Sequence, residues 1–125
     1  MPVARVVVMD DSKLMRRVLT AFLEHAGHTV EEWEPMSAME VPDRAAATEM
    51  DLLVCDFQMP GCNGATVARM ARRAKPDLPI LIVTALRDAE TLDLLKKAHV
   101  AGILHKPIEE ESFLRQVNEA LGVKV

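Results

Sequence analysis

Five polar residues follow apolar runs that lie far apart along this 125-residue chain. Asp10 and Asp11 follow "VVVM", Asp56 follows "LLVC", Thr84 follows "ILIV", and Lys106 follows "GILH". Carboxylates brought together repel one another, by roughly 3 kcal/mol for a pair about 5 Å apart at an effective dielectric constant near 20. A cluster of the three acids therefore needs compensating positive charge, which a lysine and a divalent cation can supply.

An oxygen-only ligand set of this kind favours Mg²⁺ or Mn²⁺. A metal ion beside a carboxylate, with a hydroxyl and an ammonium group opposite, suits phosphoryl transfer, because the metal and the lysine neutralise the oxygens of the transferring group. The carboxylate can itself be the nucleophile and become an acyl phosphate. These residue types predict a shallow cationic site in which Asp56 is open to a phosphoryl donor.

Each of these residues also has an ordinary structural role open to it. Asp11 or Ser12 can cap a helix, and Asp56 can cap the next turn. Thr84 can simply be a strand-end residue, and Lys106 can be a solvated charge. The functional interpretation depends on the combination of these residues, since four strand ends carry polar groups at the same edge of the sheet. The adjacent acids disfavour a phosphate-binding loop, and the chain has no G-x-G-x-x-G and no G-K-[ST] motif, which disfavours FMN or a dinucleotide.

The elements that position these residues alternate between apolar strands and amphipathic helices. We expect strands at 6–9, 28–33, 52–55, 79–83 and 101–105. We expect helices at 14–23 (with Leu14 on the buried face, closed by Gly27), 36–48 (interrupted by Pro42), 65–74, 88–98 and 109–121. This alternation predicts an α/β fold: a three-layer α/β/α, doubly wound domain with a five-stranded parallel sheet. One domain, residues 1–125, accounts for the whole chain.

The composition is that of an ordinary globular domain, with 50% hydrophobic and 27% charged residues. The net charge of -4 disfavours nucleic acid as a direct partner, and no apolar run approaches the roughly 18 residues of a membrane span. Because the N-terminus lacks a signal-peptide cleavage region, we expect a cytoplasmic protein in which Cys55 and Cys62 are reduced thiols. The basic residues of the third helix are interpreted as a solvated flank: Arg69, Arg72, Arg73 and Lys75.

In combination, these motifs resemble the CheY-like receiver domain of two-component response regulators. The similarity covers nearly all of the chain and rests on four motifs: Asp10-Asp11, the D-x-x-M-P-x-x-x-G run from Asp56 to Gly64, Thr84 after "ILIV", and Lys106-Pro107. The resemblance implies a flavodoxin-like fold with strand order 2-1-3-4-5.

The resemblance also implies a role for each site residue. Asp56 would accept a phosphoryl group from the phosphohistidine of a histidine kinase or histidine phosphotransfer domain. Mg²⁺ would be bound by Asp11, Asp56 and the backbone carbonyl of Gln58, with Asp10 acting largely through water. The chain would then be a signalling phosphoacceptor with weak intrinsic phosphotransfer and autodephosphorylation activity, and not a metabolic enzyme.

Switching is implied in the same way. Thr84 and Lys106 would bind phosphoryl oxygens, and the Lys106–Pro107 bond would be cis. Phosphorylation would draw Thr84 and its loop inward and alter the face made by the fourth helix, the fifth strand and the fifth helix. A downstream protein target would bind that face.

Three positions bear on how such a receiver would work. Ile103 stands three residues before the lysine, where receivers usually carry Tyr or Phe, and a β-branched residue cannot swing a ring between rotamers. His99 replaces a usual Gly and is expected in a left-handed cap conformation. Leu86, two residues after Thr84, is expected to limit the in-line approach of water to the acyl phosphate.

Two other functions stay open beside the phosphoacceptor. An atypical receiver, acting as a phosphorylation-independent protein-binding module, is supported by Ile103 and opposed by the intact set of site residues. A small phosphatase that uses Asp and Mg²⁺ would need a D-x-D motif after the first strand, whereas Asp10 and Asp11 are adjacent.

Overall fold

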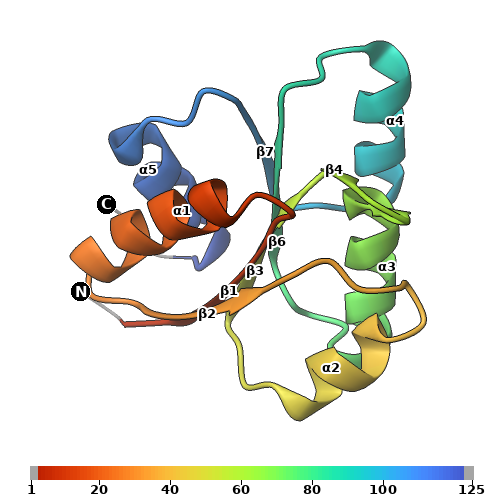
Figure 1. Cartoon of the computed structure of the whole chain (residues 1–125), viewed down its shortest axis with the longest axis horizontal. Helices are drawn as coiled ribbons and strands as arrows, with labels where there is room; N and C mark the ends of the chain where they lie inside the picture. The colour runs from red at the N-terminus through yellow and green to blue at the C-terminus, as the bar shows by residue number, and fades with distance from the viewer. Residues whose placement is uncertain (1–2, 123–125) are drawn as a thin grey trace.

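A five-stranded parallel sheet forms the middle layer of the structure, a computed structural model that describes residues 3–122 (Figure 1). Its strands are β1 (Arg5–Met9), β2 (Thr29–Trp33), β3 (Leu52–Asp56), β6 (Ile80–Thr84) and β7 (Gly102–His105). Their order across the sheet is β2-β1-β3-β6-β7, which is the order 2-1-3-4-5 that the resemblance implied. Residues 1–2 and 123–125 of the predicted domain lie outside the described residues.

Helices cover both faces of this sheet (Figure 1). On one face lie α1 (Lys13–His25) and α5 (Glu110–Ala120), and on the other lie α2 (Val41–Ala47), α3 (Gly64–Ala74) and α4 (Ala89–Lys97). Every residue of β3 and β6 is buried. Because both faces of these strands are covered, their sequences read as continuous apolar runs up to the terminal Asp56 and Thr84.

Local sequence explains where the helices begin and end. Ser12, Asn63 and Asp88 are N-caps, and the side-chain oxygen of each accepts a hydrogen bond from the backbone N–H three residues later. After α4, His99 has a φ of 54°, so the predicted left-handed conformation is confirmed. These caps set the first turns of α1, α3 and α4 close to the carboxyl edge of the sheet.

The segment between β2 and β3 differs from the prediction. The helix expected over 36–48 is the shorter α2, and Pro42 lies in its first turn instead of interrupting it. A first-turn position suits proline, because the N–H that it lacks would have no intrahelical partner there. A short antiparallel ribbon, β4 (Gln58–Met59) with β5 (Cys62–Asn63), follows β3 and was not predicted.

Two arginines are less exposed than is usual for this residue type, and one apolar residue is more exposed than predicted. Leu14 is 76% exposed, so its predicted burial is wrong, while Arg16 is only 8% exposed. Arg16 shares the inner face of α1 with Leu19 and Leu23. Arg72 is half-buried and donates hydrogen bonds to backbone carbonyls, so the interpretation of this arginine as solvated is also wrong.

Among residues 3–122, no helix has both the length and the apolar character needed to cross a membrane.

Candidate functional site

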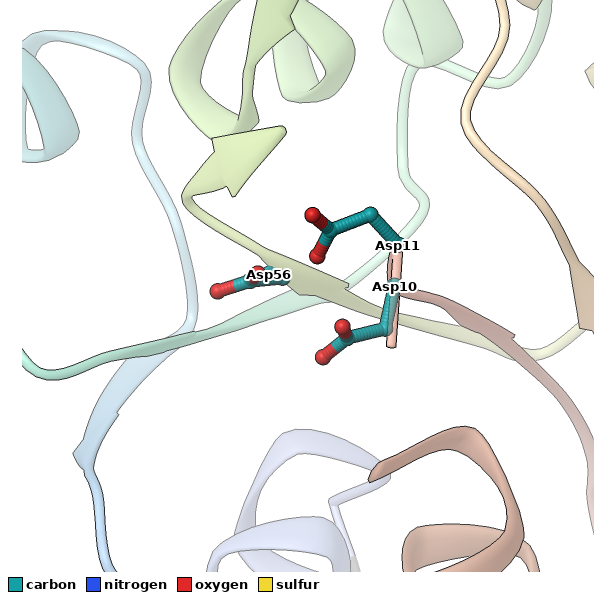
Figure 2. Close-up of side chains that lie close together, drawn as sticks. All are labelled: Asp10, Asp11 and Asp56. Carbon is teal, nitrogen blue, oxygen red and sulfur yellow. The ribbon is translucent and has the colours of Figure 1, made fainter. Parts of the chain in front are cut away.

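Three carboxylates meet at the carboxyl edge of the sheet. Asp10 and Asp11 follow β1, and Asp56 is the last residue of the neighbouring strand β3. Each offers an oxygen atom, and these oxygens all lie within 4.8 Å of one another. Figure 2 shows the three side chains reaching toward the same side of the strand ends. Parallel strands place their carboxyl ends at one edge, which is why residues 45 positions apart in the chain become neighbours.

Burial raises the free-energy cost of keeping the carboxylates of this cluster ionised. Asp10 is 1% exposed and Asp56 is 5% exposed, whereas Asp11 is exposed. Burial, assisted by the charge of Asp56, raises the pKa of Asp10 to about 6, although the backbone N–H of Ser12 donates to its Oδ1 at 2.8 Å. Burial also raises the pKa of Asp56. The protein therefore holds two carboxyl groups in a place that penalises their ionised forms.

Lys106 supplies one positive charge to the cluster. Its Nζ lies 3.4 Å from Oδ1 of Asp56, and its charge opposes the effect of burial on the pKa of that carboxyl. Its backbone N–H donates to the carbonyl of Thr84 at 2.9 Å, which fixes the end of β7 against β6. The Lys106–Pro107 peptide bond is cis, as the resemblance implied.

The arrangement fits a divalent cation. One lysine leaves most of the charge of three carboxylates uncompensated, and Oδ2 of Asp10 is buried without a hydrogen-bond partner among the described residues. An acceptor oxygen left unpaired beside two further carboxylates is what an oxygen-preferring cation would satisfy. Gln58, whose carbonyl is the remaining expected ligand, opens β4 two residues beyond Asp56.

Thr84 reaches the same edge, but its hydroxyl is engaged elsewhere. Thr84 is 1% exposed, and its Oγ1 accepts a hydrogen bond from the backbone N–H of Leu86 at 3.0 Å. In the described residues no hydrogen bond joins it to Asp56. The structure therefore brings four of the five predicted side chains into one cluster and holds the fifth beside them, turned into its own loop.

Gly64, the last residue of the D-x-x-M-P-x-x-x-G run, lies too close to the backbone of β3 to carry a side chain. A Cβ atom at this position would lie 2.9 Å from the backbone oxygen of Asp56 and 3.0 Å from Cα of Phe57. The N–H of Gly64 donates to the carbonyl of Phe57 at 2.9 Å, so the ribbon β4–β5 returns the chain to the end of β3. Only glycine allows α3 to begin this close to the backbone of Asp56.

Arg16 is a site-supporting residue that the motifs did not reveal. Its Nη1 donates to the backbone carbonyl of Asp10 at 2.6 Å, and its Nε lies 3.5 Å from Glu32 on β2. The signal was present in the spacing, because Arg16, Leu19 and Leu23 fall at i, i+3 and i+7 on one helix face. A buried arginine at that position implies a buried acceptor, and the acceptor is the strand end that carries Asp10.

Comparison with known proteins places this geometry in context. The response regulator receiver domain family matches residues 6–118 of the chain. Protein PilH of Pseudomonas aeruginosa is 34% identical over 121 residues, covering 94% of the chain and 98% of PilH. Response regulator MprA of Mycobacterium avium is 32% identical over 117 residues, but the match spans only 50% of that protein.

A solved response regulator structure has the same fold. The chemotaxis response regulator CheY4 of Vibrio cholerae superposes with a TM-score of 0.83 at 26% sequence identity, covering 95% of the chain and 99% of CheY4.

Proposed function

The chain belongs to the response regulator receiver domain family, and on that premise we propose that Asp56 is the residue that accepts the phosphoryl group. Receiver domains are the phosphoacceptors of two-component signalling and interact with histidine kinases and downstream effectors. The observation that carries the assignment is the position of the Asp56 carboxylate, which ends a buried strand 3.4 Å from Lys106 and beside two further acids.

The reaction follows from this placement. A carboxylate oxygen of Asp56 attacks the phosphorus of a phosphohistidine, the P–N bond breaks, and the imidazole leaves with the electron pair of that bond. The charge of Lys106 favours the ionised form of the carboxyl against the effect of burial, and Lys106 stays beside the oxygens of the incoming group. A bound divalent cation, with Mg²⁺ as our assignment, supplies further charge neutralisation, and the groups that would hold it are Asp10, Asp11, Asp56 and the backbone carbonyl of Gln58.

We also propose how the signal leaves the site. Thr84 gives up its bond to the N–H of Leu86 and donates its hydroxyl hydrogen to a phosphoryl oxygen. The loop after β6 then moves and alters the face formed by α4, β7 and α5, which binds the downstream protein. Water slowly hydrolyses the acyl phosphate and resets the domain. The proposed location is the cytoplasm, which suits Cys55 and Cys62 as free thiols.

The test is phosphorylation by a small donor. Incubation with acetyl phosphate and Mg²⁺ should add the mass of one phosphoryl group, measured on the intact protein. The Asp56→Asn variant and a wild-type sample containing EDTA should gain none, whereas Asp93→Asn, which changes an exposed acid on α4, should behave as the wild type. A wild-type protein that stays unlabelled, or an Asp56→Asn variant that is labelled at the wild-type rate, would contradict the proposal.

A further inference from the structure

His105, the last residue of β7, carries a buried polar atom that the site as described leaves unexplained. Its Nε2 has no hydrogen-bond partner in the part of the chain that the structure describes. Buried N–H groups without an acceptor are rare, and in the tautomer that carries its proton on Nδ1 the Nε2 atom is an acceptor. The structure therefore holds a buried acceptor for which a donor is missing.

The position of His105 relates this acceptor to Thr84. The two residues are register partners of β6 and β7, and the backbone N–H that follows His105 donates to the carbonyl of Thr84. Side chains alternate along a strand, and Ile82 and Ile103 pack on the face covered by α2, α3 and α4. Two residues further along each strand, Thr84 and His105 point to that same face as direct neighbours.

A backbone donor in the loop after β6 becomes free when the switch proposed above operates. The N–H of Leu86 is paired with Oγ1 of Thr84 at 3.0 Å, and the Leu86 side chain packs against the cluster under α3 and α4. If Thr84 turns its hydroxyl to a phosphoryl oxygen, this N–H loses its acceptor. A part-buried donor and a buried acceptor would then both lack a partner close to the carboxyl edge of the sheet, which is unfavourable.

We propose that His105 is a positioning residue for the switch: when Thr84 turns toward the phosphoryl group, the N–H of Leu86 passes from the Thr84 hydroxyl to Nε2 of His105. This inference rests on the proposed function of Asp56 and Thr84. It assigns to His105 the coupling between the site and the α4–β7 face. Ile103, two residues earlier on the same face, has no polar group with which to make that bond.

The experiment compares three substitutions in the full chain. His105→Leu removes the acceptor, His105→Gln carries an amide oxygen to the position of Nε2, and His105→Asn reaches only the position of Nδ1. Each protein is titrated with beryllofluoride, a stable substitute for the phosphoryl group, in the presence of Mg²⁺. The readout is the amide chemical shifts of residues 84–88 and of α4 and β7, recorded by NMR.

We expect the wild type and His105→Gln to show the same shifts at the same beryllofluoride concentration. His105→Leu and His105→Asn should lose the shifts of α4 and β7, and their apparent affinity should fall by about tenfold, because the switched state leaves the N–H of Leu86 unpaired. Rescue by glutamine separates positioning from packing. Ile103→Val is the matched control and should respond as the wild type.

Two results would overturn the inference: wild-type shifts and affinity in His105→Leu and His105→Asn, or a loss in His105→Gln as large as that in His105→Leu. Having both a leucine and an asparagine variant keeps the test decisive if one of them does not fold, which the unliganded spectra reveal. Labelling by acetyl phosphate in the same samples tests the function separately. An unlabelled wild type would contradict the role of Asp56, whereas labelled variants that switch normally would contradict only the role of His105.

Discussion

Arg72 of α3 donates a hydrogen bond to the backbone carbonyl of His99, with 2.6 Å between Nη2 and the oxygen. The same guanidinium donates to the carbonyl of Ala98 and, through Nε at 3.3 Å, to that of Leu78. His99 has left-handed backbone geometry at the end of α4, where the last carbonyls have no intrahelical partner. One side chain therefore satisfies the carboxyl end of α4 and joins it to α3 and to the loop before β6.

Replacing Arg72 should destabilise the fold. Arg72→Met removes three hydrogen bonds from a charged donor and leaves partly buried carbonyls unpaired, so we expect the free energy of unfolding to fall by about 2–3 kcal/mol. Urea unfolding measures this. Arg73→Met, an exposed change on the same helix, should stay within about 0.5 kcal/mol of the wild type. Equal losses in the two variants would show that the contacts of Arg72 contribute nothing specific.

Arg16 should matter to both stability and metal binding. Arg16→Met leaves Glu32 without its buried partner and leaves the carbonyl of Asp10 without this donor. The free energy of unfolding should therefore fall by about 2–4 kcal/mol. The affinity for Mg²⁺ should fall as well, because the strand end that carries Asp10 is no longer held. The matched variant is Arg17→Met, since Arg17 is 68% exposed and lies 3.8 Å from the same glutamate. Wild-type Mg²⁺ affinity in Arg16→Met would contradict the positioning role.

The metal-free protein should lose stability as the pH rises through the range in which Asp10 ionises. The pKa of Asp10 is about 6 in the folded protein against a usual 3.8, so between these values the folded state binds more protons than the unfolded state. The free energy of unfolding therefore falls as pH rises across this window, by up to about 3 kcal/mol, and the loss is complete above it.

Chemical unfolding in EDTA at several pH values measures this slope, and Asp10→Asn should reduce it, leaving the slope of the same sign that the raised pKa of Asp56 contributes. His28, whose pKa is lowered by burial, contributes a slope of the opposite sign, which cancels in the difference between the two proteins. Mg²⁺ should restore stability to the wild type at neutral pH and do much less for Asp10→Asn. A difference between the two proteins that does not change with pH would show that the Asp10 carboxyl ionises in the folded protein as it does in the unfolded chain.

The lifetime of the phosphorylated state should depend on Leu86. This side chain lies two residues beyond Thr84 and is only half-buried, so we expect part of it to restrict the approach of water to the acyl phosphate. Leu86→Ala should speed dephosphorylation several-fold, measured as the decay of phosphoprotein after the donor is removed. Leu94→Ala, a half-buried change on α4 away from the strand ends, should decay at the wild-type rate. An unchanged or slower decay in Leu86→Ala would rule this account out.

Much of the site could be predicted because parallel strands share one edge. Knowing only that Asp10, Asp11 and Asp56 end apolar runs is enough to bring them together, since the topology allows no other place for those ends. Gly64 and Pro42 also follow local rules once the start of each helix is known. The predicted burial of Leu14 was wrong because a helix can extend its apolar stripe beyond the sheet that covers it. Periodicity alone therefore overstates how many residues of a helix are buried.

What the sequence by itself determined is therefore the five strands of the main sheet, the helices between them, the parallel direction of the strands and the polar residues at the carboxyl edge, because periodicity and polarity act over a few neighbouring residues. The order of the strands came from the family resemblance. Only the tertiary structure decided that Arg16 holds the carbonyl of Asp10, that Arg72 reaches the carbonyl of His99, 27 positions away, and that Nε2 of His105, the register partner of Thr84, is buried. The physical reason is that a hydrogen-bond partner is chosen by distance and angle between elements. Those are set when the whole core packs, and no local pattern specifies them.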